Sequence, residues 1–335
     1  MLPPEYHPQS ALLLTLPRRD GGDWGPHYAD AFAAITRIAK TAARFQPVLL
    51  LTPGEVNPVS FGPTNHPITT IPVTTNDTWT RDYGPITVIE DGRPVLLDFT
   101  FNGWGLKFAA HHDNQVTRAL HERGCFGAAE RRTPGWVLEG GSIESDGAGT
   151  ILTTLNCLTA PNRNEGRTFA ELDAMLKREL GATRILYLQN GHLEGDDTDA
   201  HIDTLARFCA PDTIAYVHCD DPADSHFAEL KRMREELRTF RQLNGQPYRL
   251  VPLPWPDPVY AADGHRLPAT YANFLILNGA VLVPTYDLPQ DNAALDTLRP
   301  VFPDREVIGL DCRAIIEQHG SLHCLAMQLP VELRS

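Results

Sequence analysis

The sequence predicts an α/β fold in one compact unit of 335 residues. Helical and strand patterns alternate along the whole chain, glycines end two of the predicted helices, and no charge run or low-complexity stretch marks a linker. A chain of this length can bury a large core without disulfide bonds. We therefore expect residues 1–335 to form a single domain.

A helix and a buried strand open this alternation. Apolar residues recur at helical spacing over residues 27–45, and Pro47 separates this helix from an apolar strand at 48–52. A second helix at 113–124 ends at Gly124, a residue type that suits a helix C-terminus. Further strands in this half are expected at 68–75, 84–90, 94–101, 135–138 and 149–154.

The second half of the chain repeats the alternation of helices and strands. Its helices are expected at 168–180, ending before Gly181, and at 223–243, 290–299 and 312–318. Its strands are expected at 185–188, 213–217, 272–277, 280–284, 306–309 and 322–328. The proline-rich residues 247–258 are expected to form an ordered surface loop beside a cleft.

Composition and charge narrow the classes of partner. The net charge is −13, from 29 basic and 42 acidic residues, which argues against a nucleic-acid partner and is compatible with a cationic ligand. None of the six cysteines forms a C-x-x-C pair, so we expect a reducing compartment and no zinc ribbon. No apolar run approaches the roughly 18 residues of a membrane span, and the N-terminus shows no leader pattern. We expect a cytoplasmic protein without a membrane partner.

Polar and glycine residues gather in four segments between predicted strands, where binding sites are usually built. In residues 77–85, Asp82 is expected at the start of a strand, although a turn with a local Arg–Asp pair would explain the same residues. In residues 138–142, Glu139 precedes two glycines that would let a ligand approach the backbone closely.

Acidic residues crowd around His201 in the third segment, residues 194–203. Such crowding is costly unless water, a cation or a metal relieves it. If this stretch is strand-like, His201 and Asp203 point to the same face. Three interpretations stay open: a divalent metal site of His201 with Asp203, Asp197 or Asp199, a cation-binding acid/base site, and a solvated acidic loop.

The fourth segment, residues 319–324, ends at Cys324 beside the last predicted strand. A lone cysteine is most often a small buried hydrophobe. His323 is its neighbour in sequence, but neighbours in a strand face opposite sides. If Cys324 is a nucleophile, its proton-transfer partner is therefore expected elsewhere, for instance at His201.

Short motifs in these segments follow one another along nearly the whole chain. They are Trp-Thr-Arg-Asp-Tyr-Gly-Pro (79–85), Phe-Asn-Gly-Trp-Gly (101–105), Leu-Glu-Gly-Gly-Ser-Ile (138–143), Thr-Ile-Leu-Thr-Thr (150–154), Asn-Arg-Asn (162–164), Gly-Asp-Asp-Thr (195–198), His-Ile-Asp (201–203), Tyr-Ala-Asn-Phe (271–274) and Leu-His-Cys (322–324). In wording and order this set resembles the agmatine deiminase family, which is related to the Porphyromonas-type peptidylarginine deiminases within the guanidino-group-modifying superfamily. The resemblance implies a five-bladed, pseudo-symmetric α/β propeller, the pentein fold, with the site in its central cavity.

The resemblance also implies a reaction and a role for each site residue. Asp82 and Asp203 would hold the planar guanidinium of a small cationic substrate, and Cys324 would attack its central carbon as a thiolate. His201 would transfer protons, and Glu139 would orient and charge it. This chemistry needs no metal and no other cofactor.

The implied contacts extend to the far end of the substrate. Asp197 would pair with the distal ammonium of agmatine, Trp79 would flank the chain, and Trp104 would line the cavity. The chain departs from the family at Ala200, where a glycine is common, and at residues 319–321, where the family has a glycine-rich run ahead of the cysteine. These changes alter the pocket's shape and leave the five catalytic positions intact.

The leading hypothesis is hydrolysis of agmatine to N-carbamoylputrescine and ammonia, a step toward putrescine, through a Cys324 thiouronium. The alternative within the same chemistry is a deiminase of arginine, peptidyl arginine or another guanidino compound. Two further alternatives are a metal-dependent hydrolase using His192, His201 and the aspartates, and a non-catalytic polyamine binder. A homodimer is the default expectation for such enzymes.

Overall fold

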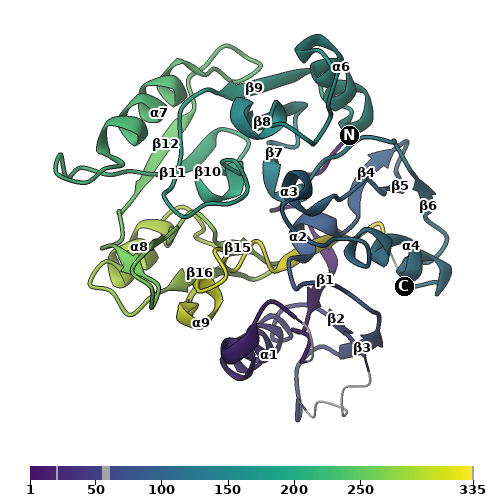
Figure 1. Ribbon diagram of the computed structural model, residues 1–335. Helices are drawn as coiled ribbons and strands as arrows, with labels where there is room; N and C mark the ends of the chain where they lie inside the picture. Colours follow the sequence, from purple (N-terminus) through teal and green to yellow (C-terminus); the bar gives the residue numbers. More distant parts are fainter. Residues whose placement is uncertain (20–21, 55–60, 334–335) are drawn as a thin grey trace.

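The computed structural model describes residues 1–19, 22–54 and 61–333 and confirms a mixed α/β fold (Figure 1). Its strands are β1 (Gln9–Thr15), β2 (Val48–Thr52), β3 (Ile68–Pro72), β4 (Ile86–Glu90), β5 (Arg93–Leu97), β6 (Glu130–Arg132), β7 (Ile143–Ser145), β8 (Thr150–Thr154), β9 (Arg184–Leu188), β10 (Ala206–Ala210), β11 (Thr213–Val217), β12 (Arg249–Leu253), β13 (Val259–Tyr260), β14 (Arg266–Leu267), β15 (Leu275–Ile276), β16 (Ala280–Thr285), β17 (Glu306–Asp311) and β18 (Ala326–Pro330).

The helices between these strands vary in length from one turn to four. The α-helices are α1 (Tyr28–Ala42), α2 (Thr80–Tyr83), α3 (Gly103–Leu106), α4 (Val116–Glu122), α5 (Leu155–Leu158), α6 (Phe169–Leu180), α7 (Phe227–Thr239), α8 (Asp291–Leu298) and α9 (Arg313–Ile316). The 3-10 helices are η1 (Gly25–His27), η2 (Asp113–Gln115), η3 (Gly140–Ser142) and η4 (Ile202–Thr204).

Five of the six sheets formed by the described residues repeat one strand pattern. In each of them a central strand pairs antiparallel with one neighbour and parallel with another, and these central strands are β1, β5, β8, β11 and β16. At least one α-helix separates each of these central strands from its parallel neighbour in sequence, as is usual for a parallel crossover. In Figure 1 the five sheets follow one another in chain order around the middle of the molecule, and the sixth is the β13–β14 hairpin.

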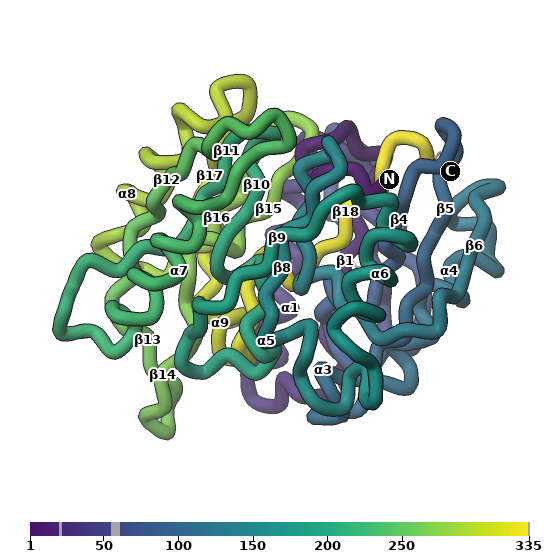
Figure 2. Tube along the Cα trace, turned by 90° about the horizontal axis from the view of Figure 1, so that it is seen from above, coloured from purple at the N-terminus to yellow at the C-terminus, as the bar shows by residue number. Residues whose placement is uncertain are grey.

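The first of these sheets joins the two ends of the chain. Strand β18 pairs antiparallel with β1, with Ala326 opposite Leu14, and Figure 2 shows β18 in yellow beside β1 in purple. This pairing fixes the start of β18, and with it Cys324 two residues upstream, beside the end of β1.

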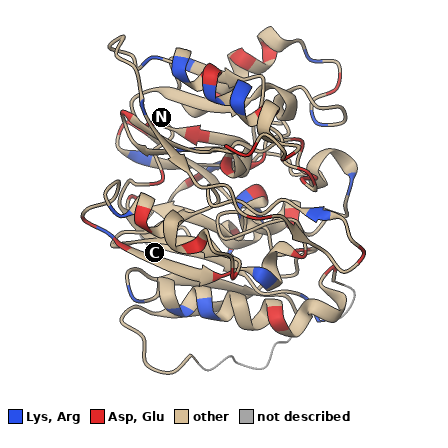
Figure 3. Ribbon diagram, turned by 90° about the vertical axis from the view of Figure 1, so that its left-hand side faces the viewer, with Lys and Arg blue, Asp and Glu red and all other residues tan. Residues whose placement is uncertain are grey.

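The central strands form the core, and the longer helices lie outside them. Every residue of β8 and β11 is buried, and α1 buries the face that its apolar spacing predicts, including Ile35 and Ile38. In the view of Figure 3, basic and acidic residues are interspersed along the outer helices. Within the part of the chain described, no helix combines the length and apolar character needed to cross a membrane.

A buried arginine fastens the N-terminal segment to this interior. Arg207 of β10 is fully buried, and its guanidinium donates to the carboxylates of both Glu5 and Glu144. It also donates to the carbonyl oxygen of Phe274 at 2.6 Å. A buried charge is tolerated only when it is paired and hydrogen-bonded, so this arrangement holds together segments that are far apart in sequence.

The structure corrects one predicted loop and one predicted strand. Residues 249–253 form the edge strand β12, where a surface loop was predicted, and the strand tolerates Pro252 because that residue is exposed at the sheet's edge. The strand predicted at 135–138 is wrong: β6 lies at Glu130–Arg132, and Val137 forms only an isolated bridge to Thr100. The apolar residues of that stretch follow Pro134 and Gly135, which interrupt regular strand pairing.

Other predicted elements are shorter than expected, and strands β1, β7, β10, β13 and β14 were not predicted. The helix predicted at 223–243 spans Phe227–Thr239, and the strand predicted at 322–328 begins only at Ala326. Strand β7 was missed because it is three residues long and ends in the polar pair Glu144 and Ser145. Both residues are buried, so tertiary packing selects a conformation that local polarity does not indicate.

Replacing Arg207 with methionine should destabilise the fold strongly. The change keeps an extended side chain but leaves Glu5 and Glu144 buried without their cation, which costs about 3–5 kcal/mol in the free energy of unfolding. Urea unfolding measures this loss. Arg313→Met, at an exposed pair with Asp311, should leave the free energy of unfolding nearly unchanged. Equal stability of the two variants would contradict the role given to Arg207.

Candidate active site

One cavity draws its lining from three of the four predicted segments, all but the glutamate–glycine segment. Its lining is strongly acidic and aromatic, and it includes one thiol. The acidic residues are Asp23, Asp77, Asp82, Asp196 and Asp197, the aromatic ones are Trp79, Trp104 and Phe108, and the thiol is Cys324. Of the predicted site residues, His201, Glu139 and Asp203 are fully buried and lie behind this lining.

Cys324 lies in the turn that precedes β18 and is almost fully buried. Its Sγ is 3.4 Å from Asn273 Oδ1 and 3.8 Å from Asp203 Oδ2, and its backbone N–H donates to the same Asn273 oxygen at 3.3 Å. Burial, followed by the negative charges of Asp203 and Asp82, raises the pKa of the Cys324 thiol well above its ordinary value. These surroundings favour the protonated thiol over the thiolate.

Asp203 lies on the short helix η4, so the strand-like conformation that was considered as one possibility for residues 201–203 is not adopted. A 3-10 turn here lets the backbone turn inward, and the carbonyl oxygen of His201 accepts from the Thr204 hydroxyl at 2.9 Å. Asp203 Oδ2 accepts from His323 Nδ1 at 2.7 Å, whereas Asp203 Oδ1 is buried without a partner. Burial opposes ionisation, but the hydrogen bond and charge of His323 outweigh it and lower the pKa of Asp203.

Asp82 lies on the single-turn helix α2, just before β4, instead of at the first residue of a strand. Its Oδ2 accepts from Trp104 Nε1 at 2.9 Å, and its Oδ1 accepts from the Gly141 N–H at 2.9 Å. Burial raises the pKa of Asp82 to about 6, opposed by the nearby His201 and reinforced by Asp203. Any cation that entered beside Asp82 would favour its ionised form.

His201 lies between two carboxylates without a hydrogen bond to either. Its Nδ1 is 3.6 Å from Asp82 Oδ1, its Nε2 is 3.7 Å from Glu139 Oε2, and both ring nitrogens are buried and unpartnered. Burial lowers the pKa of His201, but the surrounding negative groups, Asp82 and then Glu139 among them, raise it well above the ordinary value. The imidazole can therefore hold a proton and release it when a neighbouring charge changes.

Glu139 is held in place by an arginine that the sequence analysis did not single out. Arg163 Nε donates to both carboxylate oxygens of Glu139, at 2.9 and 3.0 Å, and Arg163 Nη1 donates to Asp199 Oδ2 at 2.5 Å. Burial opposes ionisation of Glu139, but His201 and Arg163 together lower its pKa. Glu139 is thus a fixed anion beside the imidazole.

The second glycine after Glu139 makes this crowding possible. A Cβ atom on Gly141 would lie 2.7 Å from both Asp82 Oδ1 and His201 Nδ1, and 3.0 Å from Asp203 Oδ2. Real Cβ atoms essentially never approach other heavy atoms so closely. The Gly-Gly pair therefore serves to bring two carboxylates and an imidazole around one point, which is the use of glycine that its missing side chain allows.

Two tryptophans form the aromatic side of the cavity. Trp104 has φ 54° and ψ 48° between Gly103 and Gly105, and the Asn102 side chain accepts from the Gly105 N–H, so the Phe-Asn-Gly-Trp-Gly motif builds a left-handed turn that presents the indole. Trp79 Nε1 donates to Asp77 Oδ2 at 3.0 Å, and its ring covers Gly320, where a Cβ would lie 2.2 Å from the indole.

The acidic third segment is largely neutralised by the protein itself. Asp199 pairs with Arg163 and with Lys107 Nζ, and Asp196 accepts from the Ala200 N–H at 2.6 Å. His192 is exposed while His201 is buried, so the metal site suggested for these two histidines is not formed. Asp197 remains on the cavity lining, and burial followed by repulsion from Asp196 raises its pKa.

Three buried residues beside the site were missed as contributors. Arg163 lies in the Asn-Arg-Asn motif, Asn273 in Tyr-Ala-Asn-Phe and His323 in Leu-His-Cys. The sequence analysis singled out each motif without giving these residues a role, and their position inside the motifs was the available signal. His323 was set aside as the base for Cys324, and the structure instead directs its ring to Asp203 and Glu5.

Comparison with known proteins gives a consistent family assignment. The family model for Porphyromonas-type peptidyl-arginine deiminases matches residues 1–330. A Stutzerimonas stutzeri agmatine deiminase is 32% identical over 354 residues, covering 98% of this chain and 95% of its own length. The solved structure of a C. jejuni agmatine deiminase variant with substrate bound has a TM-score of 0.91 at 38% identity, covering 99% of this chain and 96% of its own. A P. gingivalis protein provisionally assigned as an arginine deiminase has a TM-score of 0.94 at 48% identity and covers 99% of both chains.

The raised pKa of Cys324 predicts slow alkylation of the empty site. Because the thiolate is the reactive form, its reaction with iodoacetamide should keep accelerating as the pH rises above 9. Asp82→Asn removes one of the charges that raise this pKa, so the rate at pH 8 should increase about tenfold. Peptide mass spectrometry follows Cys324 separately from the other cysteines.

The matched control for this measurement is Asp173→Asn on helix α6, where the carboxylate pairs with Lys177 away from the cavity. It should leave the alkylation rate of Cys324 unchanged. An inflection of the parent's rate near pH 7, or no response to Asp82→Asn, would contradict the electrostatic account.

Proposed function

The chain belongs to the Porphyromonas-type peptidyl-arginine deiminase family, and we propose that it hydrolyses agmatine to N-carbamoylputrescine and ammonia. The proposal rests on one observation above all: a thiol, Cys324, lines a cavity together with the buried Asp82, and a second buried carboxylate, Asp203, lies behind that lining 3.8 Å from the sulfur. Relatives that cover nearly the whole chain are named agmatine deiminases, which supports a guanidino-modifying hydrolase.

The carboxylates are suited to a guanidinium. This group is planar and cationic and presents several N–H donors in a fixed fork, so it prefers carboxylates on more than one side. Asp203 Oδ1 is a buried acceptor without a donor, and Asp82 has a pKa of about 6, so each would be stabilised by the substrate. A guanidinium held there would place its central carbon beside Cys324.

The substrate's charge also activates the nucleophile. A guanidinium between Asp82 and Asp203 would offset the negative charges that raise the pKa of Cys324, so binding favours the thiolate. The thiolate sulfur forms a bond to the central carbon and gives a tetrahedral adduct. A terminal nitrogen takes a proton from the His201 imidazolium, and its bond to carbon breaks as ammonia leaves. A thiouronium remains on Cys324.

Hydrolysis of the thiouronium restores the enzyme. His201, now neutral, takes a proton from water, and the resulting hydroxide attacks the same carbon. The carbon–sulfur bond then breaks and returns Cys324 to the thiolate, and the hydroxyl on the carbon loses its proton to solvent as the neutral ureido product is released. Glu139, held by Arg163, would stabilise His201 in its charged form and fix its ring in both halves of the reaction.

The cavity favours an ammonium over a carboxylate at the substrate's far end. Asp197, Asp77 and Asp23 line it, and no Lys or Arg occurs among the described lining residues. The α-carboxylate of free arginine would meet uncompensated negative charge there. This distinguishes agmatine from free arginine; arginine, peptidyl arginine and other guanidino compounds remain the alternative substrates. Trp79 and Trp104 would flank the aliphatic chain.

We propose in addition that the five repeated sheets are the blades of one propeller formed by a single domain, with the cavity near its centre. The repetition of one strand pattern supports this arrangement. The cysteines are all free, which supports a reducing compartment such as the cytoplasm. A homodimer is proposed only on the general preference of such enzymes for two-fold symmetry.

A ureido-product assay on the purified protein tests the proposed function. Agmatine should be converted faster than arginine or a blocked arginine peptide, and Cys324→Ala should abolish turnover of all three. No conversion of any guanidine by the parent would refute the enzyme, and equal turnover by Cys324→Ala would refute the nucleophile. Faster turnover of arginine than of agmatine would show that arginine is the preferred substrate and would refute the assignment of agmatine.

Asp197→Asn tests the recognition of the distal ammonium. The variant should raise the KM for agmatine about tenfold or more, because a hydrogen bond to a charged group contributes roughly 1.5 kcal/mol or more. Butylguanidine, which lacks the ammonium, serves as the matched substrate, and its kcat/KM should be the same for parent and variant. An equal loss with both substrates would show that Asp197 acts on the site's structure instead.

A further inference from the structure

We propose that His323 and Glu5 act as positioning residues for Asp203, forming a buried chain that aims one carboxylate oxygen of Asp203 at the substrate's guanidinium. The inference rests on the proposed function and deepens it. Its elements come from three distant segments: the N-terminal stretch before β1, the helix η4, and the turn before β18.

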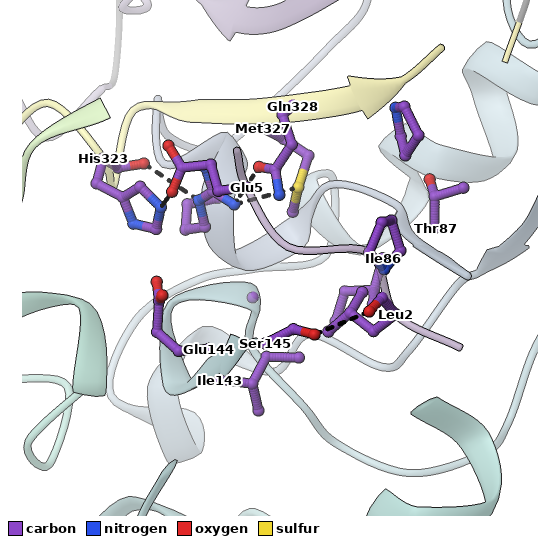
Figure 4. A pocket seen from close by; sticks show the side chains of 14 residues that line it. Leu2, Glu5, Ile86, Thr87, Ile143, Glu144, Ser145, His323, Met327 and Gln328 are labelled. Atoms are coloured by element: carbon purple, nitrogen blue, oxygen red, sulfur yellow. Dashed lines mark hydrogen bonds and ion pairs between the residues drawn. The ribbon is translucent and has the colours of Figure 1, made fainter. Parts of the chain in front are cut away.

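The chain is closely bonded and excluded from water. His323 Nδ1 is 2.7 Å from Asp203 Oδ2, and His323 Nε2 is 2.8 Å from Glu5 Oε2. All three side chains are at least nine-tenths buried. Figure 4 shows the His323 ring and the Glu5 carboxylate directed toward each other, with a dashed line between them.

Counting donors assigns the charge of His323. Carboxylates accept hydrogen bonds and, when ionised, cannot donate, so a ring nitrogen within 2.8 Å of each of two carboxylates must carry a proton. Both carboxylates are ionised: burial is outweighed by Arg207 and His323 at Glu5, and by His323 at Asp203, and the pKa of each is lowered. The two contacts thus assign a proton to each ring nitrogen of His323, between two carboxylates.

The chain is anchored at its far end and at its middle. Glu5 accepts from the Ile276 N–H at 2.6 Å and from the Arg207 guanidinium. The backbone N–H of His323 donates to Asn273 Oδ1 at 2.9 Å, and its carbonyl oxygen accepts from Arg81 Nε at 3.3 Å. Other charged groups around the ring are Arg81 and Glu144, neither of which bonds to its nitrogens.

The two carboxylate oxygens of Asp203 therefore have different roles. Oδ2 accepts from His323 Nδ1, which fixes the orientation of the carboxylate, and the same oxygen lies 3.8 Å from the Cys324 sulfur, while Oδ1 is buried without a donor. A buried acceptor without a partner costs free energy until a donor arrives. The guanidinium supplies that donor, so the chain keeps Asp203 ionised and oriented before the substrate binds.

Glu144 provides a matched control for a purely structural role. Like Glu5 it is buried and accepts from Arg207, but it makes no hydrogen bond to His323. Burial raises the pKa of Glu144, so a neutral glutamine is a mild replacement there. If Glu5 serves only to pair Arg207, Glu5→Gln and Glu144→Gln should behave alike.

The kinetic test compares these two variants with agmatine in the full-length protein. Glu5→Gln should lower kcat/KM by about 10- to 100-fold, the range expected when a group that orients a binding side chain is lost. It should also move the acid limb of the pH profile upward, because a less firmly held His323 charge lets the pKa of Asp203 rise. Glu144→Gln should keep the parent's acid limb and most of its activity. Equal effects of the two variants, or an unmoved acid limb in Glu5→Gln, would overturn the proposal.

A second measurement is independent of activity and of the stability of any variant at Glu5. In the 15N-histidine-labelled parent, NMR should show both ring nitrogens of His323 protonated at neutral pH, with the signal assigned through His323→Gln. A neutral ring, with one bare nitrogen, would overturn the proposal even if the protein is an active deiminase. A charged ring in a protein that converts no guanidine would refute the proposed function and leave the buried chain intact.

Discussion

Compensation of buried negative charge is the constraint on which the rest of this structure depends. Five carboxylates are buried close to one another, and each would be prohibitively costly without a partner. They are Glu5, Asp82, Glu139, Glu144 and Asp203. Arg207 compensates Glu5 and Glu144, and Arg163 compensates Glu139. His201 lies between Asp82 and Glu139, and His323 lies between Asp203 and Glu5. Because these cations come from distant segments, the same contacts that make the charges tolerable also hold the sheets around the cavity.

The compensation is incomplete at one point, and that point is beside the thiol. Asp203 Oδ1 lacks a donor, and Asp82 has a pKa of about 6 because burial outweighs its partners. The same uncompensated charge raises the pKa of Cys324. A cation bound between Asp82 and Asp203 would supply a donor to Asp203 Oδ1, favour the ionised form of Asp82 and lower the pKa of Cys324. The site is thus organised so that binding a guanidinium both satisfies the carboxylates and releases the nucleophile, without a resident metal in the proposed steps.

The sequence predicted site residues well where they stand in short motifs, and less well where their role depends on tertiary contacts. Residues such as Cys324 and Asp82 could be found because each stands in a distinctive local string beside a predicted strand. The partners of His323 could not, because its bonds reach Glu5 at the other end of the chain. Strand β12 was missed for a similar reason: Pro252 argues against a strand unless its position at the sheet's edge is known.

Trapping the covalent intermediate tests the central claim most directly. The parent enzyme would be mixed with agmatine, quenched in acid within the turnover time and digested for peptide mass spectrometry. The account predicts a peptide containing Cys324 that is heavier by agmatine less ammonia, and none when Cys324→Ser is treated in the same way. Turnover of agmatine without this adduct, or an adduct on another cysteine, would contradict it.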